Sequence, residues 1–296
     1  MRRKIPSLQA LTCFDAAARH QSYSRAAQEL SLTQGAVSRQ IAGLEQMLGL
    51  ELFTRTRHGV RLTERGADYA RQVAPRLQAL EQDTLDAMAA QGRGSTLHLA
   101  AVPTFATRWL IPRLPSLRAL HPQLVLHLET RTRPFMFAET PFEAALWAGT
   151  PEQIQAWAGT RAQHLLDEDV VAVCAPSLLP RGQPLFAREL AELPLLQQST
   201  RPLAWRTWFE AQGVQASQPL AGPRLELFSM TAAAAACGLG VALVPRLLIT
   251  DELASGALVL ACEAQLPPEG AYYLITPERE PDGVALQWLR AWLGGL

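Results

Sequence analysis

Residues 24–48, SRAAQELSLTQGAVSRQIAGLEQML, hold the side chains whose types and spacing point most directly to a chemistry. Apolar residues recur there at helical spacing in two runs, which predicts two helices joined by a tight turn. Ser24 is the expected N-cap of the first helix and Thr33 that of the second, because both are short hydroxyl side chains placed just before an apolar run.

The outward face of the second predicted helix carries the polar or small residues Gln34, Gly35, Ser38 and Arg39. Such a face, at the start of the second helix of a pair, lets side chains hydrogen-bond base edges in a major groove. An ordinary helical hairpin with a solvated face has the same spacing. These residues alone therefore leave two interpretations open, a nucleic-acid reader and a structural hairpin.

The flanking segments favour the first interpretation. Residues 6–19 predict a third helix, and residues 51–57 and 59–63 predict two short strands around a basic tip. Three helices followed by a basic hairpin are typical of a winged helix-turn-helix. The hairpin of such a domain sets arginines against phosphates or reaches into the adjoining minor groove.

The formal net charge of zero hides an uneven distribution along the chain. Residues 1–66 carry ten Lys or Arg against five Asp or Glu, a net charge of +5, so residues 67–296 carry −5. A basic N-terminal segment on an acidic body suits a polyanion-binding module attached to a part that stays off the polyanion.

Residues 63–90 predict one long helix interrupted by Pro75, which has no N–H to donate and should bend the helix or leave one hydrogen bond unmade. Apolar and small residues recur in steps of three and four, at Ala70, Val73, Leu77, Leu80, Thr84 and Ala87. This is heptad spacing and favours pairing with a second copy of the helix. An amphipathic helix lying on its own domain remains the alternative.

Beyond a predicted hinge at residues 91–95, the pattern changes to alternating strands and helices. The expected strands are 97–102, 124–130, 170–175, 241–245 and 272–276, and helices are expected at about 105–120 and 228–237. This order predicts an α/β fold with a largely parallel sheet, and the length suits two lobes. The segment WLRAWLGGL is expected to form a docked C-terminal helix.

The chain resembles a LysR-type transcriptional regulator along essentially its whole length. The segments that carry the resemblance are SRAAQELSLTQGAVSRQIAGLEQMLGLELFTR, LFTRTRHGVRLTERG and FATRWLIPRLPSLRALHPQLVLHLE. Later segments, WLIPRL, LLDEDVVAVCAPSLL, TWFEAQG and ACGLGVALVP, resemble the branch that includes the glycine-cleavage and β-lactamase-inducing regulators.

The resemblance implies a division into three parts. Residues 1–66 would form an all-α winged helix-turn-helix, 67–90 a dimerising linker helix, and 91–296 a two-lobed α/β effector domain similar to periplasmic binding proteins. Lobe I would comprise about 95–168 plus 270–296, and lobe II about 169–269. Regulators of this kind are bacterial homotetramers, dimers of dimers that bend promoter DNA and contact RNA polymerase in response to a small molecule.

Carried over by position, Thr33, Gln34, Gly35, Ser38 and Arg39 correspond to the DNA-reading set. Arg55 and Arg57 resemble the phosphate contacts of the wing. Gly35 departs from the Pro or Ser common at its position, which loosens the start of the helix.

The resemblance places the effector pocket between the lobes. It would be lined by the loop after the first strand (Pro103, Thr104, Phe105), the loop with Gln198, Ser199 and Thr200, the helix start near Ser229, and an aromatic of the last strand, Tyr273 or else Tyr272. Thr104 would lie at a helix N-terminus, which favours a carboxylate. Each hydroxyl has a plain helix cap as its alternative role.

The segment FEAALWAGTP departs from the pattern of this branch at two positions that would face the pocket. Glu143 stands where an Asp is typical and Trp147 where an Arg is typical. A basic side chain is thus missing at that end of the pocket. The departure predicts a more apolar or aromatic effector than usual.

Three other functions compete with this interpretation. Catalysis is disfavoured, because the six histidines form no HExxH pair, no GxSxG segment occurs, and Gly238-Leu-Gly240 lacks a dinucleotide-binding context. No catalytic residue, metal or cofactor is expected. A redox-sensing regulator would use Cys174, Cys237 or Cys262 in place of an effector. A protein-interaction module would bind DNA with little dependence on salt or on Arg39.

The sequence also predicts where the protein works. The N-terminus lacks the apolar core of a signal peptide, and no run of 18 or more apolar residues occurs. The expected location is the cytoplasm, without contact to a membrane.

Overall fold

The computed structural model describes residues 4–57, 59–89, 95–180, 182–264, 270–278 and 281–296.

Side-chain caps set where the helices of the N-terminal unit, Met1–Gly92, begin. Ser7 caps α1 (Leu8–His20), and Thr33 caps α3 (Gln34–Leu48) as predicted. Each cap accepts a hydrogen bond from the amide three residues ahead, which satisfies a donor that the helix leaves unpaired.

The predicted cap of the other helix is wrong. Helix α2 spans Tyr23–Glu29, and its N-cap is Ser22, whose Oγ accepts the Arg25 amide at 3.3 Å. Ser22 has extended backbone angles (φ −157°, ψ 121°), as an N-cap requires, whereas Ser24 already lies inside the helix.

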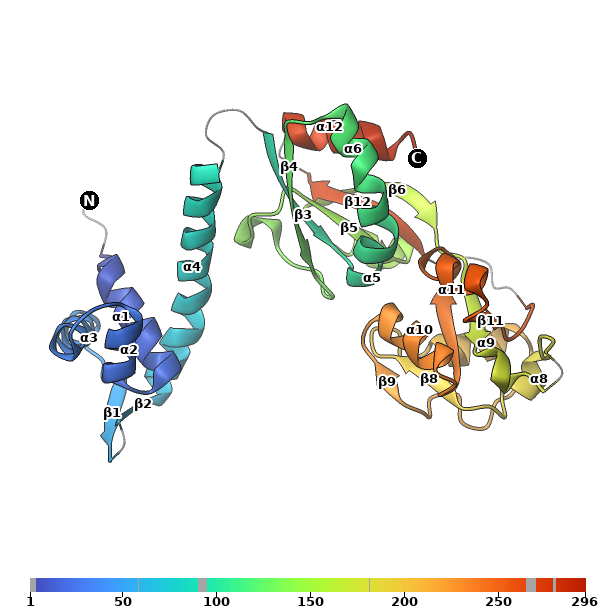
Figure 1. Ribbon diagram of the computed structural model, residues 1–296, viewed down its shortest axis with the longest axis horizontal. Coiled ribbons are helices and arrows are strands. Elements are labelled where there is room, and N and C mark those ends of the chain that lie inside the picture. Colours follow the sequence, from blue (N-terminus) through green and yellow to red (C-terminus); the bar gives the residue numbers. More distant parts are fainter. Residues whose placement is uncertain (1–3, 58, 90–94, 181, 265–269, 279–280) are drawn as a thin grey trace. The chain divides into compact units, whose positions relative to one another are not determined.

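The three helices share one core with the hairpin of β1 and β2, which is called the wing below. Phe14, Val37 and Ile41 are buried together with Phe53 of β1 (Phe53–Thr56) and Val60 of β2 (Gly59–Leu62). The two strands pair antiparallel and project from the helices as a hairpin (Figure 1). The predicted basic tip includes His58, which lies outside the described residues.

Helix α4 (Glu64–Ala89) continues through Pro75 without interruption. Its first half packs on the core through Val73 and Leu77. Further along, Leu80, Leu85 and Met88 are exposed. The side chain of Ala87 and residues 91–94 of the predicted hinge at 91–95 lie outside the described part of the chain, and Ser95 begins β3.

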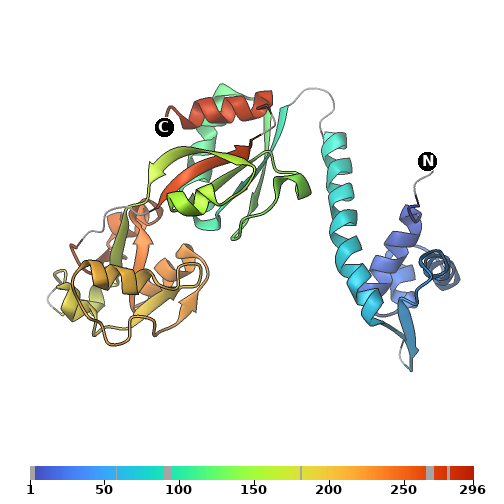
Figure 2. The ribbon, with the colours of Figure 1, turned by 180° about the vertical axis from the view of Figure 1, so that it is seen from behind.

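The second unit, Arg93–Leu296, contains two five-stranded sheets, one in each lobe. Lobe I has the strand order β4-β3-β5-β12-β6, and Figure 2 shows β12 between strands that precede it by more than a hundred residues. Its strands are β3 (Ser95–Ala101), β4 (Leu124–Thr130), β5 (Ala144–Gly149), β6 (Thr160–Asp167) and β12 (Ala271–Pro277). Its helices are α5 (Pro103–Phe105), α6 (Leu114–Leu120), α7 (Pro151–Gln155) and α12 (Val284–Leu293).

Lobe II has the strand order β11-β7-β10-β8-β9. Its strands are β7 (Val170–Cys174), β8 (Leu195–Gln198), β9 (Arg224–Leu225), β10 (Val241–Pro245) and β11 (Val259–Leu260). Its helices are α8 (Ala187–Leu190), α9 (Ala204–Ala211), α10 (Phe228–Ala236) and α11 (Thr250–Ser255).

Both sheets are mixed, so the expectation of a largely parallel sheet is wrong. In lobe I, β3 pairs parallel with β4 and β5, but β12 runs antiparallel to β5 and β6. In lobe II, β7 is antiparallel to both of its neighbours. The chain crosses between the lobes after β6 and returns before β12, and the strands next to each crossing run against their neighbours.

Apolar side chains cover both faces of the lobe I sheet. Helices α6 and α12 pack on one face, where Leu117, Leu289 and Trp292 are buried (Figure 1). The other face carries the aromatic cluster of Trp147, Trp157, Phe135, Phe137 and Phe142.

The predicted helix over 105–120 is broken into pieces. Short α5 is followed by a π turn (Ala106–Leu110), a 3-10 turn (Ile111–Arg113) and α6. Pro112 and Pro115 lack the N–H that a continuous α-helix would need at their positions. Within the described residues, no helix has the length and apolar character needed to cross a bilayer.

Candidate functional site

The second helix of the N-terminal pair, α3, presents the predicted DNA-reading residues to solvent. Gln34, Gly35 and Arg39 are exposed and Ser38 is half-buried, while Val37, Ile41 and Leu44 turn inward. Thr33 Oγ1 accepts the Ala36 amide at 3.2 Å, which fixes the first turn of the helix. The structure therefore brings all five predicted residues together at the N-terminal end of one helix.

The wing is hydrogen-bonded to this helix. Glu45 of α3 accepts hydrogen bonds from the amides of Leu52 and Phe53, at 2.7 and 3.2 Å from Oε1. Gly59 has a φ of +146° and lies so close to the Gln21 carbonyl that a Cβ there would approach the oxygen to 2.5 Å. Only glycine fits this contact between the hairpin and the turn before α2.

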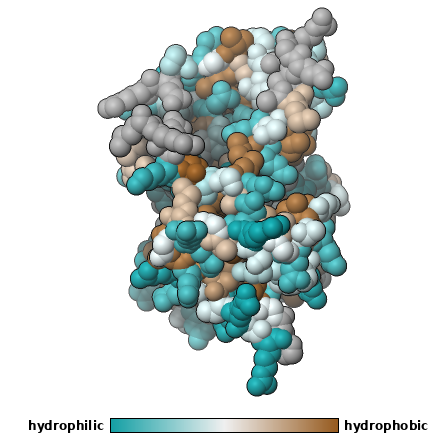
Figure 3. Space-filling view, turned by 90° about the vertical axis from the view of Figure 1, so that its left-hand side faces the viewer, coloured by the Kyte–Doolittle hydropathy of each residue, from teal (hydrophilic) through white to brown (hydrophobic). Residues whose placement is uncertain are grey.

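Arg55 and Arg57 are exposed on this hairpin, Arg55 on β1 and Arg57 directly after it. In Figure 3, which views the N-terminal unit from the side, hydrophilic side chains form the lowest projection, the tip of the hairpin. Exposed guanidinium groups on a rigid hairpin are suited to phosphate contacts.

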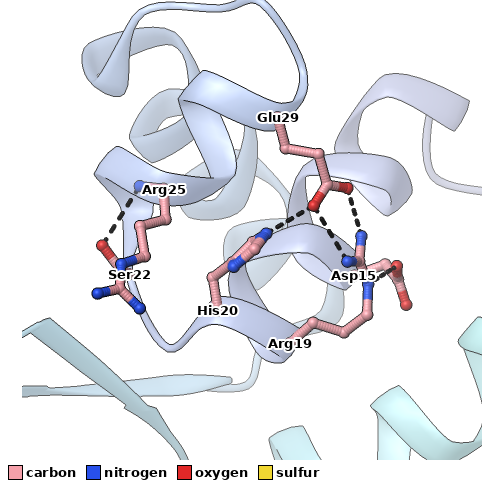
Figure 4. A network of polar contacts seen from close by, with 6 residues as sticks. All are labelled: Asp15, Arg19, His20, Ser22, Arg25 and Glu29. Atoms are coloured by element: carbon pink, nitrogen blue, oxygen red, sulfur yellow. Dashed lines mark hydrogen bonds and ion pairs between the residues drawn. The ribbon is translucent and has the colours of Figure 1, made fainter.

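An ion cluster clamps α2 against α1 (Figure 4). The Arg19 guanidinium donates to both oxygens of Glu29, at 2.5 and 3.0 Å, and to Asp15 at 3.0 Å. His20 Nε2 lies 2.6 Å from Glu29 Oε2. The hydrogen bonds from Arg19 and His20 lower the pKa of the Glu29 carboxyl to about 2.

This cluster makes the α1–α2 packing sensitive to acid. Because the Glu29 pKa falls from 4.5 to about 2, its stabilisation is complete above about pH 4.5 and is lost as the pH falls toward 2. The Glu29 side chain is 36% exposed, so solvent screens the pair, and we expect Glu29→Gln to lower the free energy of unfolding by under about 1 kcal/mol at pH 7 and by nothing measurable near pH 2.

Hydrogen exchange of the α1 and α2 amides in the full chain measures this difference as a function of pH. Glu51→Gln, which removes an exposed carboxylate of the same unit, is the control and should leave the exchange unchanged. If Glu29→Gln lowers the free energy of opening by the same amount from pH 7 to pH 3, the stabilisation by Glu29 does not come from its charge.

A cavity of about 740 Å³ opens between the two lobes of the second unit. Its lining includes six of the predicted effector residues, namely Pro103, Thr104, Phe105, Trp147, Gln198 and Thr200. Val102 and Gly149 lie at the carboxyl ends of β3 and β5, the edge where open α/β sheets bind ligands.

Four predicted residues lie outside this lining. Glu143 precedes β5, at the opposite end of the strand from Gly149, where its Oε2 accepts the His98 amide at 3.2 Å. The Ser199 amide donates to the Leu225 carbonyl and so belongs to the β8–β9 pairing. The amide of Ser229 donates to Thr104 Oγ1 at 3.1 Å, so Ser229 contacts a lining residue without lining the cavity itself.

The fourth is Tyr273, whose neighbour Tyr272 lines the cavity instead. Successive strand residues face opposite sides of a sheet, and β12 shifts register against β6 between these two tyrosines. Tyr273 packs against His164, with ring centroids 5.7 Å apart. Tyr272 is buried and stacks on Phe105 at 4.2 Å.

Sequence reasoning missed the main charged group of the cavity, a buried ion pair. Arg201 Nη1 and Nη2 lie 2.5 and 2.9 Å from the two carboxylate oxygens of Glu168, which is 2% exposed. The Tyr272 hydroxyl also hydrogen-bonds Glu168. The signal in the sequence was a charged segment, Asp167-Glu168-Asp169, directly before an apolar strand at the crossing between the lobes.

Burial shifts the protonation equilibria of this group. Burial, aided by the Glu168 charge, raises the pKa of Tyr272 well above its ordinary value, so the phenol stays protonated and donates. Burial alone would lower the pKa of Arg201, but the Glu168 carboxylate outweighs it and holds that pKa above its ordinary value.

Gln198 lines the cavity, and its side-chain amide hydrogen-bonds three neighbouring groups. Its Oε1 accepts the Thr231 hydroxyl at 2.9 Å, and its Nε2 donates to Thr200 Oγ1 at 3.2 Å and to the Glu226 carbonyl at 2.5 Å. Both ends of the amide are thus engaged within lobe II. Gln198 positions Thr200 and the start of α10 around the cavity.

The cysteines do not favour a redox switch. Cys13, Cys174 and Cys262 are buried, and burial raises the pKa of Cys174 to about 11. Cys237 is exposed at the end of α10. Among the described residues, no three His, Cys, Asp or Glu side chains are grouped to hold a metal ion.

Comparison with known proteins agrees with this architecture. Residues 8–67 match the family described as "Bacterial regulatory helix-turn-helix protein, lysR family", and residues 90–295 match "LysR substrate binding domain". The glycine cleavage system transcriptional activator of Escherichia coli K12 is 33% identical over 294 residues, 99% of this chain and 94% of the relative. The regulator TrpI of Pseudomonas aeruginosa is 35% identical over 312 residues and covers both chains fully.

Solved structures show the same fold. The effector domain of AmpR from Pseudomonas aeruginosa superposes with a TM-score of 0.59 at 28% identity, covering 68% of this chain and 93% of that one. Full-length CbnR, solved with its target DNA, superposes with a TM-score of 0.75 over 97% of this chain and 98% of that one, at 18% identity. The domain matches and the relatives together place this chain in the LysR family of bacterial DNA-binding transcriptional regulators, with an N-terminal helix-turn-helix and a C-terminal two-lobed effector-binding domain.

Proposed function

We propose that residues 1–66 read promoter DNA through Thr33, Gln34, Gly35, Ser38 and Arg39 in the major groove, while Arg55 and Arg57 contact phosphates. The observation that carries the proposal is the capped start of α3, which holds these side chains outward on a helix whose other face is buried. The attachment of the wing to Glu45 would keep the two contact regions in a fixed relation.

The linker helix at 67–90 pairs with that of a second copy in this proposal. Leu80, Leu85 and Met88 of α4 are exposed, and a second helix would remove them from water. Two such dimers would form the tetramer, which works in the cytoplasm and changes its contact with RNA polymerase when an effector binds.

The effector-binding region, residues 91–296, takes a small molecule in the cavity between the lobes. The polar lining from both lobes supports this role, because a ligand that contacts Thr104 and Thr200 together would favour one arrangement of the lobes. Pro103, Phe105, Trp147 and Gln198 complete the proposed pocket, with Tyr272 in place of Tyr273.

A thermal-shift screen of the full chain against small acids, amines and aromatic metabolites tests this proposal. A ligand at a hundred times its Kd should add about 2.7 kcal/mol, a rise of several degrees in Tm. We expect Thr104→Val to abolish the shift, since it removes a buried hydroxyl of the lining.

The control is Thr140→Val, a threonine outside the cavity lining, which should keep the shift. A shift that survives Thr104→Val would place the ligand elsewhere. The same preparations should bind DNA with a steep dependence on salt, which a protein-interaction module would lack.

A further inference from the structure

The cavity between the lobes carries more negative than positive charge. Among the described residues that line it, the charged side chains are Glu168, Arg201 and Glu226. Glu168 and Arg201 neutralise each other through two hydrogen bonds. Glu226 lines the cavity and is exposed, and it forms no ion pair with any described residue. The lining therefore presents one uncompensated negative charge to a ligand.

Two groups of the lining and its edge that could receive a carboxylate, Arg201 and the Ser229 amide, are already engaged. The positive charge of Arg201 is matched by Glu168. At the start of α10, the Ser229 amide is bonded to Thr104 Oγ1 at 3.1 Å. The wall that Trp147 and Trp157 form is uncharged, so it supplies no cation of its own. A simple anion would meet net negative charge in the cavity, and Arg201 and the Ser229 amide already have partners.

The walls instead offer aromatic surfaces. Trp147 and Trp157 line the cavity from lobe I, with ring centroids 5.1 Å apart at an interplanar angle of 71°. Phe105 and Tyr272 stack at 4.2 Å, and the Arg201 guanidinium lies 5.1 Å over the ring of Phe228. Aromatic faces attract cations as well as flat apolar groups. One cation already rests on an aromatic face in this cavity.

We propose that the effector carries a protonated amine on an aromatic or large apolar body. The body occupies the wall formed by Trp147 and Trp157, and the ammonium group is held by Glu226 and the aromatic faces. A carboxylate on the same molecule is compatible with this site, but a carboxylate without the amine is not recognised. This inference rests on the proposed function of the cavity as the effector site.

Calorimetric titration of the full chain with matched compounds tests the inference. One series is tryptamine, tryptophan and indole-3-propionate, and the other is phenethylamine, phenylalanine and 3-phenylpropionate. Within each series the body stays the same while the amine and the carboxylate are present together or singly. We expect at least one amine-bearing member to bind about tenfold more tightly than the member that carries only the carboxylate.

Variants of two glutamates test which carboxylate binds the ammonium group of the ligand. Glu226→Gln should weaken binding of the amines about fivefold and leave that of the carboxylates unchanged or tighter. Glu263→Gln removes an exposed carboxylate of the same lobe outside the lining and should change neither. Amine binding that ignores Glu226→Gln would overturn the inference.

The remaining outcomes separate this inference from the proposed function. Carboxylate-only compounds that bind as tightly as the amines, and lose affinity with Thr104→Val, would overturn the amine requirement and leave the cavity as the effector site. If none of the six compounds binds, the inference is also overturned, while DNA binding by the same preparation is measured independently.

Discussion

Replacing Arg39 with alanine is expected to weaken binding to a specific DNA site by about 1–3 kcal/mol, roughly 5- to 150-fold in Kd. Arg39 is exposed on α3, in the second turn after the capped start of the helix. From that position a guanidinium can donate two hydrogen bonds to the O6 and N7 atoms of a guanine, which no other base pair accepts equally well.

Fluorescence anisotropy with a site selected by the full chain from a random DNA pool measures this loss. The matched control is Arg71→Ala, which removes an exposed arginine of α4 and should change Kd less than twofold. Arg55→Ala and Arg57→Ala should weaken binding to all DNA sequences alike. Each should also make the slope of the logarithm of the binding constant against the logarithm of salt concentration shallower by about one.

The comparison of specific and random DNA decides the role of Arg39. If Arg39→Ala weakens both equally, the side chain contacts phosphate and not a base. If it weakens neither, the predicted orientation of α3 in the major groove is wrong.

Replacing Arg201 with alanine is expected to destabilise the second unit by about 3 kcal/mol. The substitution strands the Glu168 carboxylate, 2% exposed, without its partner. Arg201 is itself 31% exposed on its side chain, so the loss should fall at the low end of the range for buried pairs. Tm should drop by roughly 6–12 °C for a unit of this size.

Thermal unfolding of the full chain measures this loss, and a second substitution identifies its cause. Adding Glu168→Gln to Arg201→Ala removes the stranded charge while keeping an oxygen for the Tyr272 hydroxyl. The double variant should recover more than half of the lost stability.

A surface pair in the same lobe is the control for this experiment. Arg206 and Glu210 lie 3.7 Å apart, and both are exposed. Arg206→Ala should lower the free energy of unfolding by under about 0.5 kcal/mol. An Arg201→Ala variant as stable as Arg206→Ala would mean that water already solvates the Glu168 carboxylate in the folded chain.

The sequence alone determined the local features that short-range chemistry controls. The hydroxyl at Thr33 and the apolar spacing of Val37, Ile41 and Leu44 were enough to predict a capped helix and its outward face, because a helix repeats every 3.6 residues whatever surrounds it. The hairpin with Arg55 followed in the same way from two short runs around a turn.

The tertiary structure decided what depends on residues far apart in the chain. Glu168 and Arg201 are 33 positions apart and meet only because the fold brings the crossing segment before β7 next to the loop after β8. Tyr272, not Tyr273, lines the cavity, because successive residues of β12 face opposite sides of the sheet, and the pairing of β12 with β5 and β6 decides which side each tyrosine takes. Glu143 lies away from the cavity because the direction of β5 places it at the opposite end of that strand.

One physical reason explains why the helix caps could be predicted from the sequence and the cavity residues could not. Caps and helical faces are set by interactions within about four residues, which the order of side chains specifies directly. Strand direction, register and the pairing of buried charges depend on which strands become neighbours, and that depends on the folding of the whole unit. The proposed DNA-reading surface therefore lies in one continuous segment of the chain, whereas the cavity proposed for the effector forms only when the two lobes have folded together.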